Sequence, residues 1–251
     1  MIPKIIHYCW FGRGPKPALA EACIASWKKY LPEYQIIEWN EDNFDVSANA
    51  YIREAYEEKK YAFVSDYARF DILYKFGGLY FDTDVEVIAS FDEIVAAGPF
   101  MGCEMPASPG QDPMKLCVAA GLGMGAVPGM ELYKQVIDHY NSIHYLVNGK
   151  AVARPLSVVE HVTAILCRNG LRNVDEVQQV GGINIYPHDF FCPVSVVDFA
   201  LRITDRTVSI HHYAASWRPK HHKWKRRLQR TLGPGITNFI IKIKDVILRR
   251  K

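Results

Sequence analysis

A short apolar strand that runs directly into two carboxylates is the feature that most constrains this chain. A helix is predicted from Ser65 to Phe76, with Ser65 as its N-cap, because apolar residues recur there at three- and four-residue steps. Gly77-Gly78 ends that helix, since glycine readily takes the left-handed backbone that closes one. The strand 79–81 follows at once and leads into Asp82-Thr83-Asp84. Two unpaired carboxylates are costly to bury, so this pattern indicates a polar site at the end of the strand.

The first forty residues predict the opening of an α/β fold. Residues 4–10 indicate a buried strand, 18–30 a helix that ends before Pro32, and 35–39 a second strand. Strand, helix and strand joined by short loops are typical of a sheet with parallel strands. Further elements are expected as helices near 130–143 and 158–169, and as short strands near 183–186 and 207–213.

Composition favours one globular domain with an appendage. The chain has 251 residues, of which 49% are hydrophobic and 23% charged, as in an average soluble domain. We expect a catalytic domain over 1–218 and a tail over 219–251. The six cysteines include no CxxC pair, so we expect reduced thiols and no zinc site. With no long apolar run and no signal-peptide pattern, we expect a cytoplasmic protein.

Charge divides the chain into an acidic body and a basic tail. From residue 218 onward there are 12 lysines and arginines and a single acid, whereas the rest of the chain carries 18 basic and 26 acidic residues. After the break at 233–235, apolar residues of the tail fall on one helical stripe with charged residues opposite. This pattern is typical of a helix lying in a membrane interface. A helix packed against the domain is the alternative.

The candidate chemistry lies in the central stretch. Asp82 and Asp84 are two residues apart and can project to one side of an extended chain, where they offer oxygen ligands to Mg²⁺ or Mn²⁺. A cation held there could neutralise a diphosphate. Asp66 and Arg69 share one face of the preceding helix. Because the rest of that helix is largely apolar or aromatic, they suggest a polar site more than a surface ion pair.

The stretch 61–85, YAFVSDYARFDILYKFGGLYFDTDV, resembles the DxD region of glycosyltransferase family 32. The opening IPKIIH, with Trp10, is similar to the first βα unit of that family. The resemblance implies an α/β fold of the GT-A nucleotide-sugar transferase type, with a Rossmann-like, mostly parallel central sheet. It also implies a nucleotide-sugar donor bound through Mn²⁺ or Mg²⁺. The implied catalytic residues are the donor-binding Asp66 and Arg69, Asp82 near the ribose and the water shell of the metal, and Asp84 as direct metal ligand.

Two further donor contacts are implied by the same resemblance. Trp10 is expected where related enzymes hold the nucleotide base. The segment 209–217, SIHHYAASW, is similar to the C-terminal segment with which GT-A enzymes complete the cation's coordination. It implies His212 as a metal ligand and Trp217 as a contact of the diphosphate, with His211 as the alternative ligand in a shifted register. Ala215 stands where distant relatives have a serine ligand.

We therefore expect a metal-dependent, retaining glycosyltransferase of the hexosyltransferase type. It would move a sugar from a UDP- or GDP-sugar to a saccharide or lipid-linked saccharide acceptor, in the synthesis of a polysaccharide, lipopolysaccharide or capsule precursor. Glu104, Glu160 and His161 are candidates for the acceptor side, and the glycines at 121, 123 and 125 would let a sugar approach the backbone.

Two other functions are compatible with parts of the pattern. One is a metal-dependent phosphoester hydrolase that uses Asp82, Asp84 and His212. The other is a non-enzymatic basic module that binds a membrane or nucleic acid. The acidic body and the lack of a nucleic-acid motif argue against nucleic acid. Through the tail we expect peripheral attachment to the anionic inner face of the cell membrane.

Overall fold

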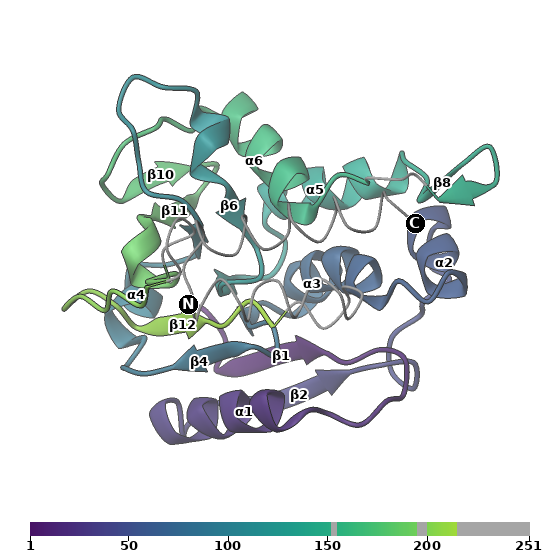
Figure 1. The fold of residues 1–251 in the computed structure, drawn as a ribbon, viewed down its shortest axis with the longest axis horizontal. Coiled ribbons are helices and arrows are strands. Elements are labelled where there is room, and N and C mark those ends of the chain that lie inside the picture. Colours follow the sequence, from purple (N-terminus) through teal and green to yellow (C-terminus); the bar gives the residue numbers. More distant parts are fainter. Residues whose placement is uncertain (152–154, 195–199, 215–251) are drawn as a thin grey trace, which may run out of the picture.

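The computed structural model describes residues 1–151, 155–194 and 200–214, in which helices cover a central sheet (Figure 1). Trp217 and the basic tail 219–251 lie outside the described residues, and so does Ala215. The elements follow in the order β1 (Ile5–Cys9), α1 (Ala18–Tyr30), β2 (Gln35–Trp39), α2 (Ala50–Glu57), α3 (Tyr61–Phe76), β3 (Gly78–Tyr80), β4 (Val85–Val87), α4 (Asp92–Ala96), β5 (Phe100–Cys103), η1 (Pro113–Leu116), β6 (Val118–Ala119), β7 (Met124–Ala126), α5 (Glu131–Asn141), β8 (Leu146–Val147), β9 (Lys150–Ala151), α6 (Val158–Arg168), β10 (Gln178–Val180), β11 (Ile183–Tyr186), η2 (His188–Phe190) and β12 (Ser209–His211).

Eight strands of the described chain form the central sheet, in the order β10-β11-β5-β7-β3-β1-β2, with β6 paired to β5. β1 pairs parallel with β2 and β3, and β11 pairs parallel with β5. β7 lies antiparallel between β3 and β5, so β1, β2, β3, β5 and β11 all run in one direction. This mixed α/β architecture with a mostly parallel sheet confirms the expected fold class and is consistent with a GT-A type fold.

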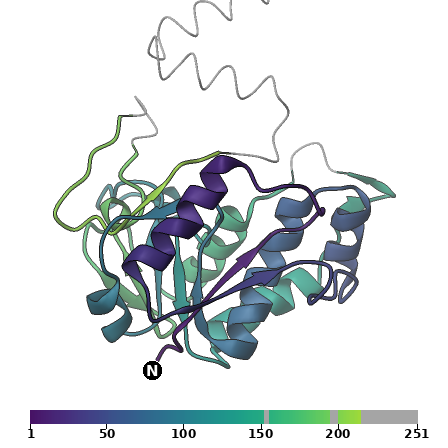
Figure 2. The same cartoon turned by 90° about the horizontal axis from the view of Figure 1, so that it is seen from below.

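The sheet separates two hydrophobic cores, because successive residues of a strand face opposite sides. Tyr80 of β3 belongs to the core formed with α2, α3, α5 and α6. Its neighbours Leu79 and Phe81 belong to the other core, together with Trp27 of α1. In Figure 2 the molecule is seen from the side of α1, which crosses in front of the sheet. The strand that leads into the DxD motif is therefore covered on both faces, as its apolar sequence predicts.

The turn between α3 and β3 requires its two glycines. Gly77 and Gly78 have φ angles of 63° and 96°, in the left-handed region, and they end α3 as predicted. A Cβ atom on Gly78 would lie 2.7 Å from the carbonyl oxygen of Ile5. The absence of side chains here lets the turn approach β1, which fixes where β3 begins and hence where the acids after it are placed.

The structure differs from the sequence expectations at two helices. α3 begins at Tyr61, four residues before the predicted N-cap Ser65, and the Ser65 hydroxyl instead donates to the Tyr61 carbonyl one turn earlier. The helix α2 was not predicted, although Asn49 caps it by accepting a hydrogen bond from the Ile52 amide. The six cysteines are free, as expected. Within the described residues, none of the helices is both long and apolar enough to span a membrane.

The parallel strands end at one edge of the sheet, and polar residues follow several of them there. Asp82 comes after β3, Trp10 after β1, Asn40 after β2 and Glu104 after β5. In open α/β sheets, ligands bind outside the carboxyl ends of the strands. A ligand-binding site is therefore expected at this edge of the sheet.

Candidate active site

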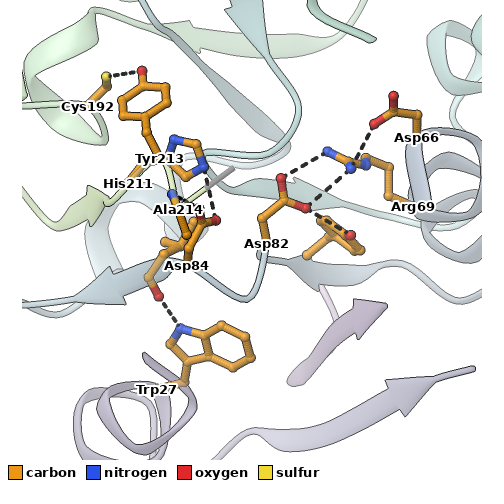
Figure 3. A network of polar contacts seen from close by, with 11 residues as sticks. Trp27, Asp66, Arg69, Asp82, Asp84, Cys192, His211, Tyr213 and Ala214 are labelled. Carbon is orange, nitrogen blue, oxygen red and sulfur yellow. Dashed lines mark hydrogen bonds and ion pairs between the residues drawn. The ribbon is translucent and has the colours of Figure 1, made fainter. Parts of the chain in front are cut away.

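The acids of the DxD motif lie beside a histidine from the far end of the described chain. β12 pairs antiparallel with β4, and this register sets His211 opposite Val85, the residue that follows Asp84. Ligand atoms of Asp82, Asp84 and His211 all lie within 4.8 Å of one another. Figure 3 shows the Asp84 carboxylate next to the His211 imidazole, with Asp82 alongside and its carboxylate directed toward Arg69. The sequence predicted the two acids, and the pairing of β4 with β12 supplies the third group.

Asp84 is held by several groups at once. Its Oδ1 atom lies 3.1 Å from Nε2 of His211, and its Oδ2 atom accepts a 2.7 Å hydrogen bond from the Ala214 amide. Burial alone would raise the pKa of Asp84, but His211 and the Ala214 N–H outweigh it and lower that pKa below its usual value. Burial lowers the pKa of His211, whereas the Asp84 carboxylate raises it above the usual value. Asp84 is thus an ionised carboxylate, as a metal ligand must be.

His212, the expected ligand, lies apart from this cluster. Its Nε2 atom is 2.8 Å from Oε2 of Glu86, while its backbone amide donates to the Asp84 carbonyl. Adjacent residues in extended chain point to opposite faces, so only one of the two histidines can face Asp84. The structure places His211 there, which was the alternative register, and we replace His212 by His211 in the candidate ligand set.

Arg69 joins the helix α3 to the DxD motif. Its Nη2 atom lies 3.0 Å from Oδ1 of Asp66 and 3.3 Å from Oδ1 of Asp82. The residues Arg69 and Asp66 are only 3% and 8% exposed, so this is a buried ion pair and not a surface one. Tyr80 completes the group, since its hydroxyl donates to Asp82 at 3.1 Å and its ring lies under the guanidinium. The shared helix face therefore does carry a polar site, as the sequence indicated.

In this group, the ionised form of Asp66 is energetically disfavoured. Burial raises the pKa of Asp66 to about 7, with Asp82 adding to the effect and Arg69 opposing it. Burial would lower the pKa of Arg69, but Asp82 and its other neighbours keep it raised above the usual value. The permanently charged guanidinium of Arg69 is thus the shared ion-pair partner of two carboxylates, Asp66 and Asp82. An active site that uses charged groups commonly shows such perturbation.

The glycine-rich segment 121–125 packs against these residues. A Cβ atom on Gly121 would lie 2.1 Å from Oδ2 of Asp82, and one on Gly123 would contact the Phe81 ring. The Gly121 carbonyl also accepts a hydrogen bond from the Asp82 amide. We expected these glycines to admit a sugar to the backbone, but the space is taken by the chain's own Asp82 and Phe81.

A hollow of about 240 Å³ lies at the same edge of the sheet, beyond the ends of β1 and β2. Trp10 forms part of its wall, and the Trp10 indole N–H donates to the Gly14 carbonyl. The other lining residues are Arg13, Gly14, Lys16, Glu38, Asn40 and Glu41. An aromatic ring beside mixed charged and amide groups is suited to a polar, planar ligand.

The three acceptor-side candidates have different surroundings. Glu160 forms a capping box with Ser157 at the start of α6, which is a structural role. His161 lies 2.8 Å from His139 of α5, and burial, together with His139, lowers the His161 pKa to about 4. Only Glu104 follows a strand at the edge that carries the DxD motif.

Three contributing residues were not singled out from the sequence. Tyr80 precedes Asp82 by two residues, so its place on the same side of the chain was predictable from strand periodicity. Tyr213 packs its ring against His211, and its hydroxyl lies 2.8 Å from Sγ of Cys192. Nothing in the sequence relates Cys192 to Tyr213, because their contact depends on how β12 returns to the sheet.

The residues present fit a divalent cation. Two carboxylates and an imidazole are ligands that Mn²⁺ accepts, and Mg²⁺ favours the carboxylate oxygens. Nδ1 of His211 is buried and has no hydrogen-bond partner among the described residues, while its Nε2 faces Asp84. With Arg69 and Asp66 alongside, this edge combines a candidate metal centre with a fixed positive charge.

Comparisons with known proteins agree with this chemistry. Residues 17–101 match the family described as "Glycosyltransferase sugar-binding region containing DXD motif". The match includes the Asp66–Arg69 pair and the DxD acids, so this part of the chain is similar to the DXD region of glycosyltransferases. That description is broader than family 32.

No curated protein matches the chain. Among solved structures, the chain is similar to a protein described as "PaToxG Glycosyltransferase", with 18% sequence identity and a TM-score of 0.40. The similarity covers 55% of this chain and 59% of that one. A likeness at this distance carries no information on substrate.

Proposed function

We propose that this protein is a metal-dependent glycosyltransferase of the family 32 type, which moves a sugar from a UDP- or GDP-sugar to a saccharide acceptor. The observation that carries the proposal is the convergence of Asp82, Asp84 and His211 next to the buried Arg69–Asp66 pair. A diphosphate needs positive charge around it, and a sugar needs hydrogen-bonding groups. This edge of the sheet offers both.

Asp84 and His211 would hold the cation directly, with Asp82 beside them. Mn²⁺ is the proposed ion, and Mg²⁺ is the alternative. When bound, the cation would neutralise negative charge on the diphosphate as the sugar departs. The lowered pKa of Asp84 supports this role, since a carboxylate must be deprotonated to coordinate a metal.

Arg69 and Asp66 would position the donor's sugar and its phosphate side. The guanidinium is held in place by two carboxylates, so it needs little reorganisation when a substrate binds. The ion pair with Arg69 engages Oδ1 of Asp66, and the other oxygen of this carboxyl group can accept a hydrogen bond from a sugar hydroxyl. Trp10 and the hollow beside it would receive the base, and Trp217 would contact the diphosphate.

We propose transfer with retention of the anomeric configuration. The acceptor oxygen bonds to the anomeric carbon on the face from which the diphosphate leaves, as the carbon–oxygen bond to the phosphate breaks. The acceptor hydroxyl proton passes to the departing phosphate oxygen. This route needs no protein nucleophile, and the role of the protein is to hold both substrates and to stabilise the leaving group.

The basic tail extends the proposal to cellular location. Twelve basic residues against one acid beyond residue 217 favour an anionic surface, at roughly 1 kcal/mol for each residue close to it. We propose peripheral attachment to the inner face of the cell membrane, where a lipid-linked saccharide of a polysaccharide, lipopolysaccharide or capsule precursor would be the acceptor. Co-sedimentation with anionic vesicles, for the full chain and for a chain ending at residue 218, tests this. Equal, weak sedimentation of the two would contradict it.

The activity itself is tested with a panel of UDP- and GDP-sugars, with Mn²⁺ or with EDTA, in the presence and absence of saccharide acceptors. We expect Mn²⁺-dependent release of nucleoside diphosphate from one donor, with a glycosylated product seen by mass spectrometry. The product's anomeric configuration, read by NMR, tests retention. Hydrolysis of simple phosphoesters without any sugar transfer would instead favour the hydrolase alternative.

A further inference from the structure

Tyr213 has a backbone conformation that calls for an explanation. Its φ angle is 50°, in the left-handed region that non-glycine residues rarely occupy. Such conformations persist only where the surrounding structure holds them, and they cluster at functional sites. Tyr213 stands two residues after His211 and one residue before Ala214, and both of these residues contact Asp84. The unusual residue therefore lies between two contacts of the candidate metal ligand.

The Tyr213 ring packs against the His211 imidazole. The two ring centroids are 4.2 Å apart, and the planes meet at 71°, an edge-to-face contact visible in Figure 3. Metal-binding histidines usually have their second ring nitrogen anchored by a hydrogen bond, which sets the orientation of the ring. In the described chain, Nδ1 of His211 is buried and has no such partner. The contact with the Tyr213 ring can take the place of this hydrogen bond in orienting the His211 imidazole.

The ring of Tyr213 is itself anchored at its hydroxyl. Sγ of Cys192 lies 2.8 Å from the hydroxyl oxygen, within hydrogen-bond distance. Burial raises the pKa of the Cys192 thiol to about 12, so the sulfur keeps its proton. The thiol and the phenol can each donate or accept, so a hydrogen bond forms between them in either direction.

We propose that Tyr213 is a positioning residue for the metal site, which holds the His211 imidazole toward Asp84 while Cys192 holds the Tyr213 ring. The anchor comes from another segment, since Cys192 follows η2. The inference rests on the proposed cation site at Asp82, Asp84 and His211. It assigns a role in metal binding to residues that do not touch the metal.

The test is Mn²⁺ affinity of the full-length protein without donor, measured by titration of free Mn²⁺ with electron paramagnetic resonance. Tyr213→Leu removes the ring and should weaken binding by about tenfold or more, the usual loss when a ligand's support is removed. Tyr213→Phe keeps the ring and loses its anchor, so a smaller loss of about threefold is expected. Cys192→Ala should match it, and the Tyr213→Phe/Cys192→Ala double variant should lose no more than either single change, because both changes remove the same hydrogen bond.

Tyr133→Phe is the matched control. Tyr133 is fully buried, its hydroxyl has no hydrogen-bond partner among the described residues, and its ring packs on Phe70 of α3. Its Mn²⁺ affinity should equal that of the wild type. Melting temperatures of all variants show whether a loss of affinity comes from a loss of folding.

Wild-type Mn²⁺ affinity in both Tyr213→Leu and Tyr213→Phe would overturn the inference. If Tyr213→Leu does not fold, wild-type affinity in Tyr213→Phe is enough to overturn it. Asp84→Asn, measured alongside, separates this outcome from failure of the proposed function. If Asp84→Asn loses Mn²⁺ while the Tyr213 variants keep it, the cation site stands and only the positioning role fails. If Asp84→Asn keeps Mn²⁺, the cation site itself is wrong.

Discussion

Nε2 of His211 lies 3.1 Å from Oδ1 of Asp84, across the antiparallel pair of β12 and β4. The next residue, His212, faces away and contacts Glu86. The sequence shows two adjacent histidines, and only the register of the two strands decides between them. A shift of one residue would exchange their faces.

This register yields the first prediction. His211→Ala should weaken Mn²⁺ binding by more than about tenfold, because the site loses a candidate ligand and the partner of Asp84. His212→Ala should leave the affinity within about twofold of the wild type and serves as the matched control. Titration of free Mn²⁺ distinguishes the two. A larger loss in His212→Ala than in His211→Ala would show that the register found here is not the one that binds metal.

A second prediction concerns Arg69, which serves Asp66 and Asp82 together. Arg69→Ala and Asp66→Ala should each cut the rate of sugar transfer by about a hundredfold or more, the size of a single electrostatic contribution at an active site. Arg172→Ala, which breaks an exposed pair with Glu176, is the control and should leave the rate unchanged. Steady-state rates at saturating donor give the comparison. A rate for Arg69→Ala close to the wild type would remove this pair from the donor site.

The raised pKa of Asp66 makes a third prediction, on stability. The folded-state pKa is about 7 and lies above the usual value, so the folded state binds the extra proton. This contribution to the free energy of unfolding is fully present below the unfolded pKa and is lost as the pH rises through about 7. In metal-free buffer, wild-type stability should fall by roughly 2–4 kcal/mol relative to Asp66→Asn between pH 4.5 and pH 8.

Denaturant unfolding of both proteins across that pH range measures the difference. Asp138→Asn changes a largely exposed carboxylate and controls for the general effect of removing one charge. If the difference in free energy of unfolding between the wild type and Asp66→Asn stays constant with pH, the pKa of Asp66 is not raised by burial.

A fourth prediction uses the contact between Gly121 and Asp82. Gly121→Ala would place a methyl group 2.1 Å from Oδ2 of Asp82, so the carboxylate must move and Mn²⁺-dependent transfer should fall by about tenfold or more. Gly125→Ala instead meets the ring of Phe100 in the core, and it should lower the melting temperature more than the Mn²⁺ affinity. Melting curves and Mn²⁺ titrations of both variants test the contrast. Unchanged transfer in Gly121→Ala would contradict the close packing.

Local sequence determined much of this molecule, because the first strand, α1, the α3–β3 turn and the DxD acids are specified by residues close together in the chain. Apolar periodicity, Pro32 and the Gly77-Gly78 pair are enough to predict them. The helix α2 was also within reach, since Asn49 caps an amphipathic turn that buries Tyr51 and Ile52.

Contacts between segments that are far apart in the sequence could not be predicted from local patterns. β7 lies between β3 and β5 although its sequence has little strand character. Its Gly125 packs against Phe100, and the glycines just before the strand, Gly121 and Gly123, pack against Asp82 and Phe81. The choice of His211 and the anchoring of Tyr213 by Cys192 both depend on where β12 pairs. Pairing over such distances is set by the whole fold and not by local pattern.

The central claim is that Asp84 binds the cation through which the protein holds a nucleoside diphosphate. Isothermal titration of UDP and of GDP into the wild type and into Asp84→Asn, with Mn²⁺ and with EDTA, tests it most directly. We expect one nucleotide to bind to the wild type only with Mn²⁺, and this binding to be lost in Asp84→Asn at an unchanged melting temperature. Equal Mn²⁺-dependent binding by Asp84→Asn and the wild type would show that Asp84 does not hold the cation.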